Sequence, residues 1–370
     1  MLKIGSFWRF YKNFDWILLL AVIVVSAIGL AAIYSIDLSL GGNKLRYFPT
    51  QATALAIGLV VLFVAASFHA SFYWVSARAI YGFTILSLVA VLFLGTTIRG
   101  TRGWFRVVGF SFQPAELAKV ALVIFLAWLI NRYGRRFEKY KFVVSTGLFS
   151  LFPMVLIMLQ PDLGSAIVLG AVWLGLMVAT GTRKRFVFGV LGITICAFLV
   201  GWFFLFKDYQ KERFLTFIYP DRDPLRSGYN VSQSLIAIGS GGVFGRGLGF
   251  GSQSQLHFLP EAQTDFIFSV VAEELGFIGI TMVLTLYVLI FWRLLRIARL
   301  GSDDFGAYCV VGVLLVFLVQ IIINIGGATG FLPVTGITLP FLSYGGSSIV
   351  INLLLVGIAE SIARASKQSS

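Results

Sequence analysis

Long apolar runs with very few charges constrain this chain more than any other feature. A run of about 20 apolar residues can cross the hydrocarbon core of a bilayer as a helix. Of the 370 residues, 58% are hydrophobic and 12% are charged, which excludes a water-soluble domain. We therefore predict an all-α polytopic membrane protein with about ten transmembrane helices. The runs lie near residues 16–37, 50–68, 79–95, 114–131, 142–159, 163–181, 187–206, 265–292, 306–328 and 344–363.

The basic residues predict how these helices are oriented. With ten spans, clusters such as 132–141, 183–185 and 293–299 fall on one face with both termini, and the positive-inside rule makes that face cytoplasmic. Residues 207–263 then form one large extracytoplasmic loop within a single domain, 1–370, and its regularly spaced apolar residues predict that the loop folds. The net charge of +13 is explained by topology and attraction to anionic lipid, so no nucleic-acid partner is expected.

Acidic residues follow a proline at three places on the predicted outer face, in segments 113–116, 160–162 and 259–265. This pattern predicts that a proline begins an apolar helix and that the acid lies in its first turns. Helix starts favour both residue types, so capping is an alternative explanation for Glu116 and Asp162. Lys119 lies three residues after Glu116, on the same helix face. We expect the two to form an ion pair inside the protein.

Asp265 lies where the polar segment LPEAQT meets an apolar run. A carboxylate at such a boundary is partly desolvated, which raises its pKa and makes it a better proton acceptor at neutral pH. A helix-start acid held by a backbone amide is the alternative. Glu273 and Glu274 lie within the run, and we expect them to hydrogen-bond to neighbouring helices.

The outer loop contains further candidates. Residues 232–240 predict a short amphipathic helix, and the glycine-rich segment 241–251 forms either a backbone cradle for a diphosphate or a set of tight turns. Arg213 and Arg246 are candidate phosphate partners by charge, with a solvated surface position as the alternative. Residues 327–348 predict a re-entrant or broken-helix element that lines a cavity.

Several segments together resemble one family. FQPAELAK (112–119), QPDLGSA (160–166), YQKERFL (209–215), DPLRSGYNVSQSLIAIGSGG (223–242), FLPEAQTDFIF (258–268), AEELG (272–276) and LPFLSYGGSS (339–348) are similar to segments of the SEDS family. These proteins are membrane-embedded peptidoglycan glycosyltransferases of shape, elongation, division and sporulation. The segment before and through FLPEAQTDFIF is more similar to the rod-elongation type, RodA, than to the division type, FtsW.

The resemblance implies that the protein polymerises lipid II into β-1,4 glycan strands on the outer face of the bacterial cytoplasmic membrane. It implies that Asp265 is the general base, and that Glu116, Lys119 and Asp162 support it in a central cavity. Many members carry an arginine directly before the tryptophan of the preceding loop, where this chain has Gly103.

Positive charge for the departing diphosphate would then come from a neighbouring side chain or from a divalent cation such as Mg²⁺ or Mn²⁺, and these alternatives stay open. The candidate side chains are Lys119, Arg102, Arg106, Arg213 and Arg246.

The resemblance also implies partners. They are a class B penicillin-binding protein, which is a transpeptidase, and other proteins of the elongation complex. Two other functions compete with the polymerase: a lipid II flippase or transporter, and a scaffold that only recruits the transpeptidase. A transporter would place ionisable residues near the midplane and show repeat symmetry, whereas these acids cluster at the outer helix ends.

Overall fold

The computed structural model describes residues 13–39, 45–98, 100–107, 110–133, 140–205, 227–301 and 303–369, with the single residues 211, 215 and 217. Every predicted apolar run forms a helix in this part of the chain. Nine of the described helices are long and apolar enough to cross a membrane, and α7 is a shorter apolar helix, which confirms the polytopic architecture. The helices are α2 (Trp16–Ser39), α3 (Tyr47–Ser67), α4 (Ala70–Leu94), α5 (Pro114–Tyr133), α6 (Tyr140–Met158), α7 (Leu163–Ala179), α8 (Lys184–Val200), α12 (Ile267–Leu300), α13 (Asp304–Ala328) and α14 (Gly346–Ser369).

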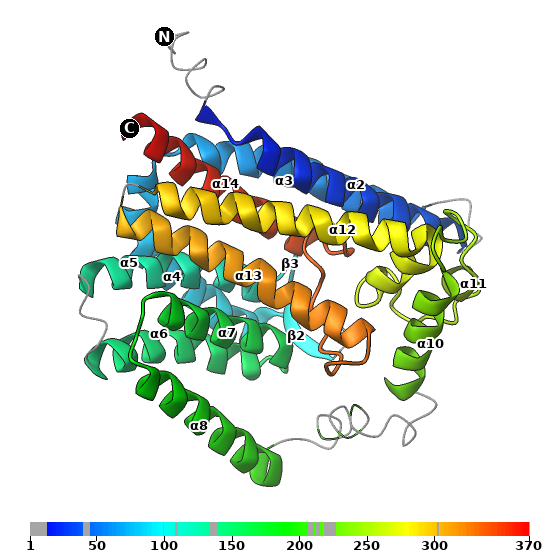
Figure 1. Cartoon of the computed structure of the whole chain (residues 1–370). Coiled ribbons are helices and arrows are strands. Elements are labelled where there is room, and N and C mark those ends of the chain that lie inside the picture. The colour runs from blue at the N-terminus through cyan, green and yellow to red at the C-terminus, as the bar shows by residue number, and fades with distance from the viewer. Residues whose placement is uncertain are drawn as a thin grey trace.

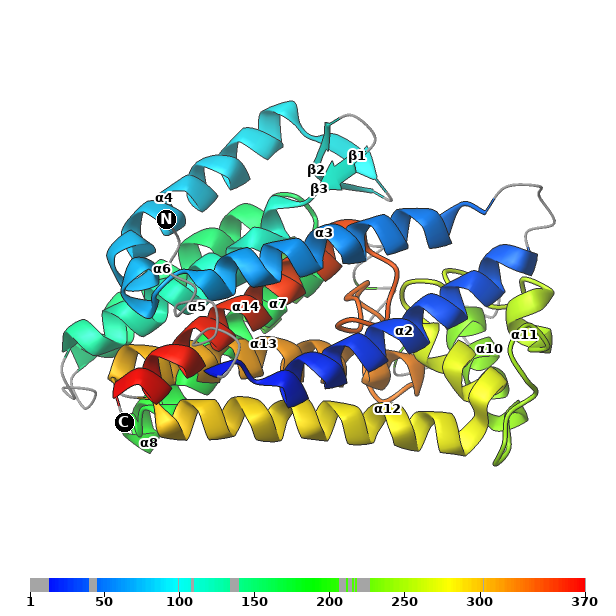
Figure 2. The same ribbon diagram turned by 90° about the horizontal axis from the view of Figure 1, so that it is seen from above.

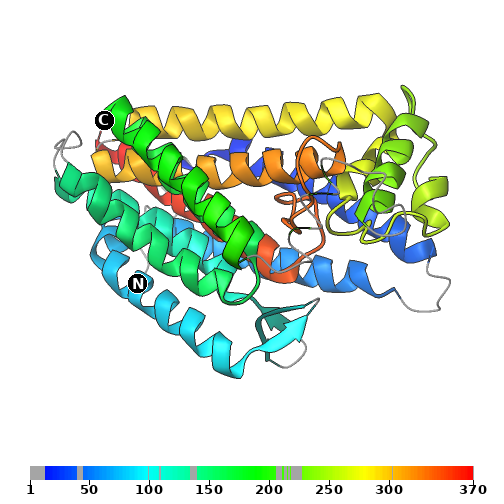
Figure 3. The same cartoon turned by 90° about the horizontal axis from the view of Figure 1, so that it is seen from below.

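The helix α5 is enclosed by other helices. The helix α8 lies at the edge of the bundle (Figures 1 and 3). Nearly every side chain of α5 from Pro114 to Ile130 is buried, because α4, α7 and α13 pack around it. In contrast, the side chains of α8 are largely exposed, including Phe188 and Ile193, and a π-helical turn, η1 (Gly201–Leu205), follows it. Because α5 is enclosed, a charged residue on it can pair only with other groups inside the protein.

A small antiparallel sheet, which the sequence analysis did not predict, connects α4 to α5. Its strands are β1 (Thr96–Ile98), β2 (Thr101–Val107) and β3 (Phe110–Phe112), in the order β1-β2-β3. Arg102 on β2 donates its Nε to the carbonyl oxygen of Gly95 (3.2 Å) and its Nη2 to that of Phe93 (2.8 Å). It therefore caps the last turn of α4, where a cation also complements the helix dipole.

The described part of the outer loop is folded, as predicted. It contains α10 (Ser227–Ser240), which includes the predicted amphipathic helix, and the short α11 (Ser252–Gln255). Ser234 Oγ lies 2.6 Å from Ser269 Oγ of α12 and donates to the carbonyl oxygen of Ala328 at 2.6 Å. Figure 2 shows α10 and α11 at one end of the bundle, opposite the C-terminal end of α14.

The glycine-rich segment forms tight turns that are bonded to a kink in α12. The backbone N–H groups of Arg246 and Gly247 donate to the carbonyl oxygens of Glu273 and Glu274 at 3.0 Å each, and the N–H of Phe277 donates to the carbonyl oxygen of Gly242. These hydrogen bonds pair backbone groups of α12 at the kink, where the regular hydrogen bonding of the helix is interrupted. The tight-turn alternative is therefore the one that the structure supports, and a diphosphate cradle made of the same amides is not available.

Gly276 allows the kink, and replacing it with alanine is expected to destabilise the protein. Its backbone has φ 66° and ψ −161°, a region almost restricted to glycine, and an added Cβ would meet Val243 O at 2.6 Å. The free energy of unfolding should fall by about 1–3 kcal/mol. Thermal unfolding in detergent measures the loss, with Gly189→Ala as the control, because a Cβ there meets nothing within 4 Å. A Gly276→Ala protein as stable as the control would contradict this explanation of the kink.

Buried charged residues join α12 and α14 to the start of α2 at the other end of the bundle. Arg293 donates its Nε to Asp15 Oδ2 (2.8 Å) and forms an ion pair with the same carboxylate, while the backbone N–H of Asp15 donates to Glu360 Oε2 (3.0 Å). The three residues are at most 8% exposed. One buried cation therefore lies beside two buried carboxyl groups.

Candidate functional site

Asp265 lies in a turn, not in a helix as predicted. The N–H groups of Thr264 and Asp265 both donate to the carbonyl oxygen of Glu261, at 3.0 and 3.1 Å, and α12 begins only at Ile267. Contacts from the segment before α14 hold this turn, since Ser343 Oγ donates to Thr264 O (2.7 Å) and the N–H of Tyr344 donates to Gln263 O (2.8 Å).

The turn changes two predictions. The pattern of a proline that begins a helix with an acid in its first turns holds for Pro114 and Glu116 alone, because Asp162 lies just before α7 and residues 259–265 lie before α12. Asp265 itself is half-buried, whereas Phe266 and the following residues through Glu274 are buried. Ala262, Gln263 and Thr264 before it are also buried, at 4%, 8% and 7% exposure, and Ser343 and Tyr344 contact them, so the predicted boundary between a wet and a dry environment is not present at Asp265.

A small cavity of about 10 Å³ lies beside Asp265, which is about the space that one water needs. Asn324 of α13 and Thr335 also line it. The Nδ2 of Asn324 donates to the carbonyl oxygens of Asp265 (3.2 Å) and Ile337 (2.8 Å), which orients the amide. Its Oδ1 and the Oγ1 of Thr335 are buried and accept no hydrogen bond from the described residues.

Oxygen atoms of this kind are suitable ligands for Mg²⁺ or Mn²⁺. The donor types at the cavity therefore fit a hard cation, although the described residues contain no group of three or more His, Cys, Asp or Glu side chains that could hold a metal.

Glu116 and Lys119 form the predicted ion pair on α5. Lys119 Nζ lies 2.7 Å from Glu116 Oε2, and the two side chains are 1% and 8% exposed respectively. Burying either charge alone would be costly, so the pair is the arrangement that makes both tolerable inside the protein. The pair places a lysine in the interior near the N-terminal end of α5.

Asp162 is close to this pair and belongs to a second polar group. It accepts hydrogen bonds from Ser165 N (2.9 Å), Ser165 Oγ (2.8 Å) and Gln113 Nε2 (3.0 Å), and it caps α7. Part of the residue stays exposed, but burial of its carboxyl group raises the pKa of Asp162. The hydrogen bonds from Ser165 lower that pKa, Glu116 raises it and Lys119 lowers it.

The segment between α13 and α14 and the first turn of α14 lie against the polar group around Asp162. Gln113 N donates to Ser347 Oγ of α14 at 3.2 Å, and an added Cβ on Gly164, next to the Asp162 turn, would lie 2.8 Å from Thr335 O. The same segment lines the cavity at Asp265 and supplies the contacts of Ser343 and Tyr344. Residues 329–345 contain no regular helix or strand, so the predicted broken element that lines a cavity is confirmed.

Of the four candidate arginines, Arg102 and Arg106 both lie on β2, whereas Arg246 lies in the glycine-rich segment. Arg102 caps α4, as described above. Arg246 is exposed and donates its Nε to Ser240 O (3.2 Å), while Arg213 lies outside the described residues. The observed positions of Arg102 and Arg246 correspond to capping and surface roles.

Glu273 and Glu274 inside α12 form hydrogen bonds, as predicted. Most of their partners lie in the outer loop, whereas the prediction placed them in neighbouring helices. Glu273 accepts from the N–H groups of Gln253 (2.8 Å) and Ser254 (3.2 Å) at the start of α11. Glu274 accepts from the hydroxyl of Ser35 on α2 and from Gly249 N (3.3 Å).

Three amide side chains in or near these groups were missed by the sequence analysis. Gln113 binds Asp162, Asn324 binds the Asp265 turn, and the buried Gln160 donates to the carbonyl oxygen of Leu88 on α4 at 3.4 Å. An added Cβ on Gly103 would lie 3.0 Å from Gln160 Oε1, which gives a physical reason for a glycine there. The repeated Gln-Pro pair and an asparagine inside an apolar run were the available signals.

Comparison with known proteins gives matches over nearly the whole chain. Residues 15–368 match the FtsW/RodA/SpoVE family of cell cycle proteins. Peptidoglycan glycosyltransferase MrdB of Escherichia coli K12 is 38% identical over 94% of this chain and 91% of its own length. Stage V sporulation protein E of Bacillus subtilis is 36% identical over 95% and 98%, and a probable peptidoglycan glycosyltransferase FtsW of Geobacter metallireducens is 34% identical over 94% of each.

Two solved structures have the same fold. The first is a chain from work on the structural coordination of polymerization and crosslinking by a peptidoglycan synthase complex, with a TM-score of 0.80, 31% identity, and coverage of 96% of this chain and 99% of that one. The second is rod shape determining protein RodA of Thermus thermophilus, with a TM-score of 0.70, 30% identity, and coverage of 95% and 97%. Together with the motifs around Glu116, Asp162 and Asp265, these matches show that the chain belongs to the SEDS (FtsW/RodA/SpoVE) family of polytopic membrane proteins.

Proposed function

We propose that this protein is a peptidoglycan glycosyltransferase that polymerises lipid II into β-1,4 glycan strands. The observation that carries the proposal is its similarity along 94% of its length to a relative named as a peptidoglycan glycosyltransferase. The described structure supports it with polar side chains gathered around one non-helical segment at one end of the bundle. An elongation role agrees with the identity of 38% to MrdB, compared with 34% to the FtsW relative.

In the proposed mechanism, Asp265 is the general base. Its carboxylate accepts the proton of the acceptor's GlcNAc 4-hydroxyl while that oxygen attacks the donor's anomeric carbon. The new C1–O4 bond forms with inversion as the bond from C1 to the lipid diphosphate breaks. A half-buried carboxylate in a fixed turn suits this role, because its position is held by Asn324 and Ser343 and not by a flexible loop.

The departing diphosphate needs positive charge, and Lys119 is the best-placed side chain among the described residues. It is buried beside the carboxylate of Glu116 and interacts with that of Asp162. A diphosphate bound to Lys119 would therefore take the place of negative charge that these carboxylates already supply. The alternative is a divalent cation at Asp265, Asn324 and Thr335, which would supply the charge directly.

The family also supports a proposal for the protein's location and partners. We propose that it lies in the bacterial cytoplasmic membrane with both termini in the cytoplasm and Asp265 at the outer face, which agrees with the distribution of basic residues. A class B penicillin-binding protein is the proposed partner, together with other elongation-complex proteins. The similarity to a chain from a peptidoglycan synthase complex supports this.

Polymerisation of lipid II by the purified protein tests the proposal. Wild-type protein, alone and with a cognate class B penicillin-binding protein, is incubated with lipid II, and the products are separated on a gel. We expect glycan polymer from at least the complex. If neither preparation makes polymer while the protein moves lipid II across liposome membranes, the enzyme proposal fails and the flippase explanation replaces it.

A further inference from the structure

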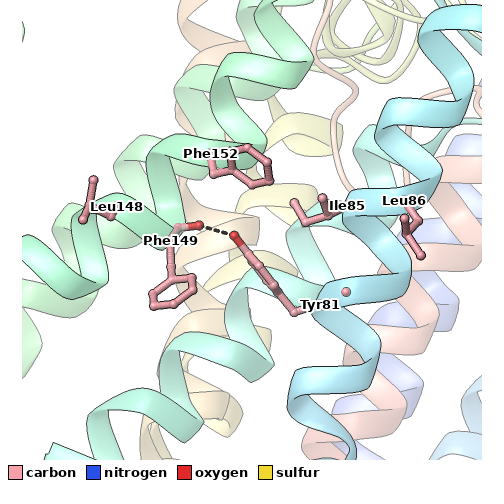
Figure 4. A pocket seen from close by; sticks show the side chains of 7 residues that line it. Tyr81, Ile85, Leu86, Leu148, Phe149 and Phe152 are labelled. Atoms are coloured by element: carbon pink, nitrogen blue, oxygen red, sulfur yellow. Dashed lines mark hydrogen bonds between the residues drawn. The ribbon is translucent and has the colours of Figure 1, made fainter.

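Apolar side chains line the outer surface of the membrane-spanning helices, where lipid covers them. Leu86 on α4 and Phe152 on α6, for example, lie on either side of an apolar groove of about 620 Å³ between the two helices (Figure 4). A transmembrane surface of this kind needs no partner other than lipid, because lipid tails are as apolar as leucine side chains. Large apolar side chains that are exposed outside the spanning helices need a separate explanation.

Such side chains are concentrated in the glycine-rich segment of the outer loop, residues 241–251. They are Val243, Phe244, Leu248 and Phe250, and the two phenylalanines are 80% and 76% exposed. The segment cannot turn them inward, because its backbone is hydrogen-bonded to α12 on both sides of the kink at Gly276. Their exposure is therefore a fixed feature of the fold.

The hydrogen bonds to α12 also fix the depth of this segment in the membrane. Arg296 on α12 is exposed and marks one boundary of the hydrocarbon core, because a charge within the core is costly. Gly276 lies 20 residues before Arg296, which corresponds to about 30 Å of helix and to about the thickness of the core. Gly276 and the turns bonded to it therefore lie at the opposite boundary of the core.

At this level, α12 itself begins to face lipid. Phe277 and Ile278 are exposed, whereas residues 266–274 are all buried. The N–H of Ile278 donates to the carbonyl oxygen of Val243 at 3.2 Å, so Val243 and the following Phe244 lie beside this exposed face. The apolar surface of the glycine-rich segment is thus continuous with the lipid-facing surface of α12.

Arg246 lies on the side of the segment that is farther from the hydrocarbon core. Its N–H donates to the carbonyl oxygen of Glu273, whereas Gly242 accepts from the N–H of Phe277, four residues later on α12. Four residues correspond to about 6 Å of helix, so Arg246 lies about 6 Å farther out than Gly242. Its side chain is exposed. Apolar side chains toward the core and a cation at the headgroup level are typical of an element that lies in the membrane interface.

We propose that residues 241–251 are immersed in the interface of the bilayer. Phe244 and Phe250 contact the acyl chains of ordinary phospholipid, and Arg246 lies at the level of the lipid phosphates. Phospholipid is the occupant because this surface continues that of a membrane-spanning helix at the edge of the hydrocarbon core. The outer loop is thereby anchored to the bilayer, and Glu273 connects the anchor to α11. This inference does not depend on the proposed function.

Spin labels test the depth of the segment in lipid nanodiscs that contain neither lipid II nor a partner protein. Cys196 and Cys309, the two cysteines of the chain, are replaced by alanine, and Phe244→Cys, Arg246→Cys and Phe250→Cys are labelled one at a time. We expect the labels at positions 244 and 250 to collide more with oxygen, which concentrates in the bilayer, than with a water-soluble nickel chelate. The label at position 246 should be more accessible to the nickel chelate than the label at position 244.

Two exposed positions are the matched controls. A label on Ile278→Cys, on the lipid-facing side of α12, should behave like the label at position 244, and a label on His69→Cys, in the turn between α3 and α4, should behave as a site in water. Thermal unfolding checks that each labelled protein is folded, and Leu248→Cys replaces Phe244→Cys if that variant is not.

A label at position 244 that is as accessible to the nickel chelate as the label at position 69 would overturn the proposal. If a class B penicillin-binding protein then removes that accessibility, the surface docks a protein and not lipid. Neither result requires glycan polymer to form, so the proposal can fail while the proposed function stands.

Discussion

Asp265→Asn is expected to lower kcat for glycan polymerisation by about 10²–10⁴-fold, which is about 3–5 kcal/mol in the activation barrier. Asparagine has nearly the same shape but cannot accept the proton of the attacking hydroxyl. The backbone contacts of the turn, from Asn324 to Asp265 O and from Ser343 to Thr264 O, do not involve the carboxylate and should persist. Asp304→Asn, which makes the same change in the first turn of α13, should leave kcat unchanged.

A pH–rate profile at saturating Mg²⁺ distinguishes a base from a cation ligand. If Asp265 is the base, kcat of the wild type falls as the pH drops through the pKa of the carboxyl group, because the protonated form cannot accept a proton. That acidic limb should persist at saturating Mg²⁺ and be absent from the residual activity of Asp265→Asn. If saturating Mg²⁺ removes the limb from the wild-type profile, the carboxylate holds a cation and the base assignment is wrong.

Arg293→Met is expected to lower the free energy of unfolding by about 3–5 kcal/mol, the largest loss of stability that we predict. Arg293 is the cation that pairs with the buried Asp15, and the backbone of Asp15 is bonded to the buried Glu360. Removing it leaves the buried Asp15 carboxylate without its cation. Thermal unfolding in detergent should show a clear drop for Arg293→Met and little change for Arg296→Met, one turn further along α12, where the side chain is exposed.

The double variant Asp15→Asn with Arg293→Met tests the cause of that loss. Replacing both members of a buried ion pair by neutral side chains is often much less destabilising than removing one. The double variant should therefore be more stable than Arg293→Met alone, giving a coupling energy in a double-mutant cycle. Strictly additive losses would show that the charge of Asp15 is not what Arg293 compensates.

Local sequence predicted the parts of the site that depend on neighbours along one helix. The spacing of Glu116 and Lys119 predicted an ion pair, and the pair is present because residues three apart share a helix face. That prediction needed only helix periodicity and the cost of burying charge. The change from polar to apolar residues at Asp265 predicted a boundary between a wet and a dry environment, and this prediction is wrong, because contacts from Ser343 and Tyr344 help to bury Gln263 and Thr264.

Contacts between distant segments decided the rest. Helix periodicity continued α12 back to Asp265, but Ser343 and Tyr344, about 80 residues later in the chain, hold residues 261–266 as a turn. The glycine-rich segment allowed two interpretations until its amides were found bonded to the kink at Gly276. Asn324 was one amide in an apolar run, and only the fold placed it beside Asp265.

The sequence by itself determined the polytopic fold class, the positions of the apolar helices and the ion pair on α5. These follow from hydropathy and from the cost of unpaired charge in a bilayer, which act on each segment alone. The tertiary structure decided that Glu273 and Glu274 hold the outer loop, that Asp265 adjoins the cavity with Asn324 and Thr335, and that α4 and α6 leave a groove between them. Each of these depends on where separate helices pack against one another, which no single segment encodes.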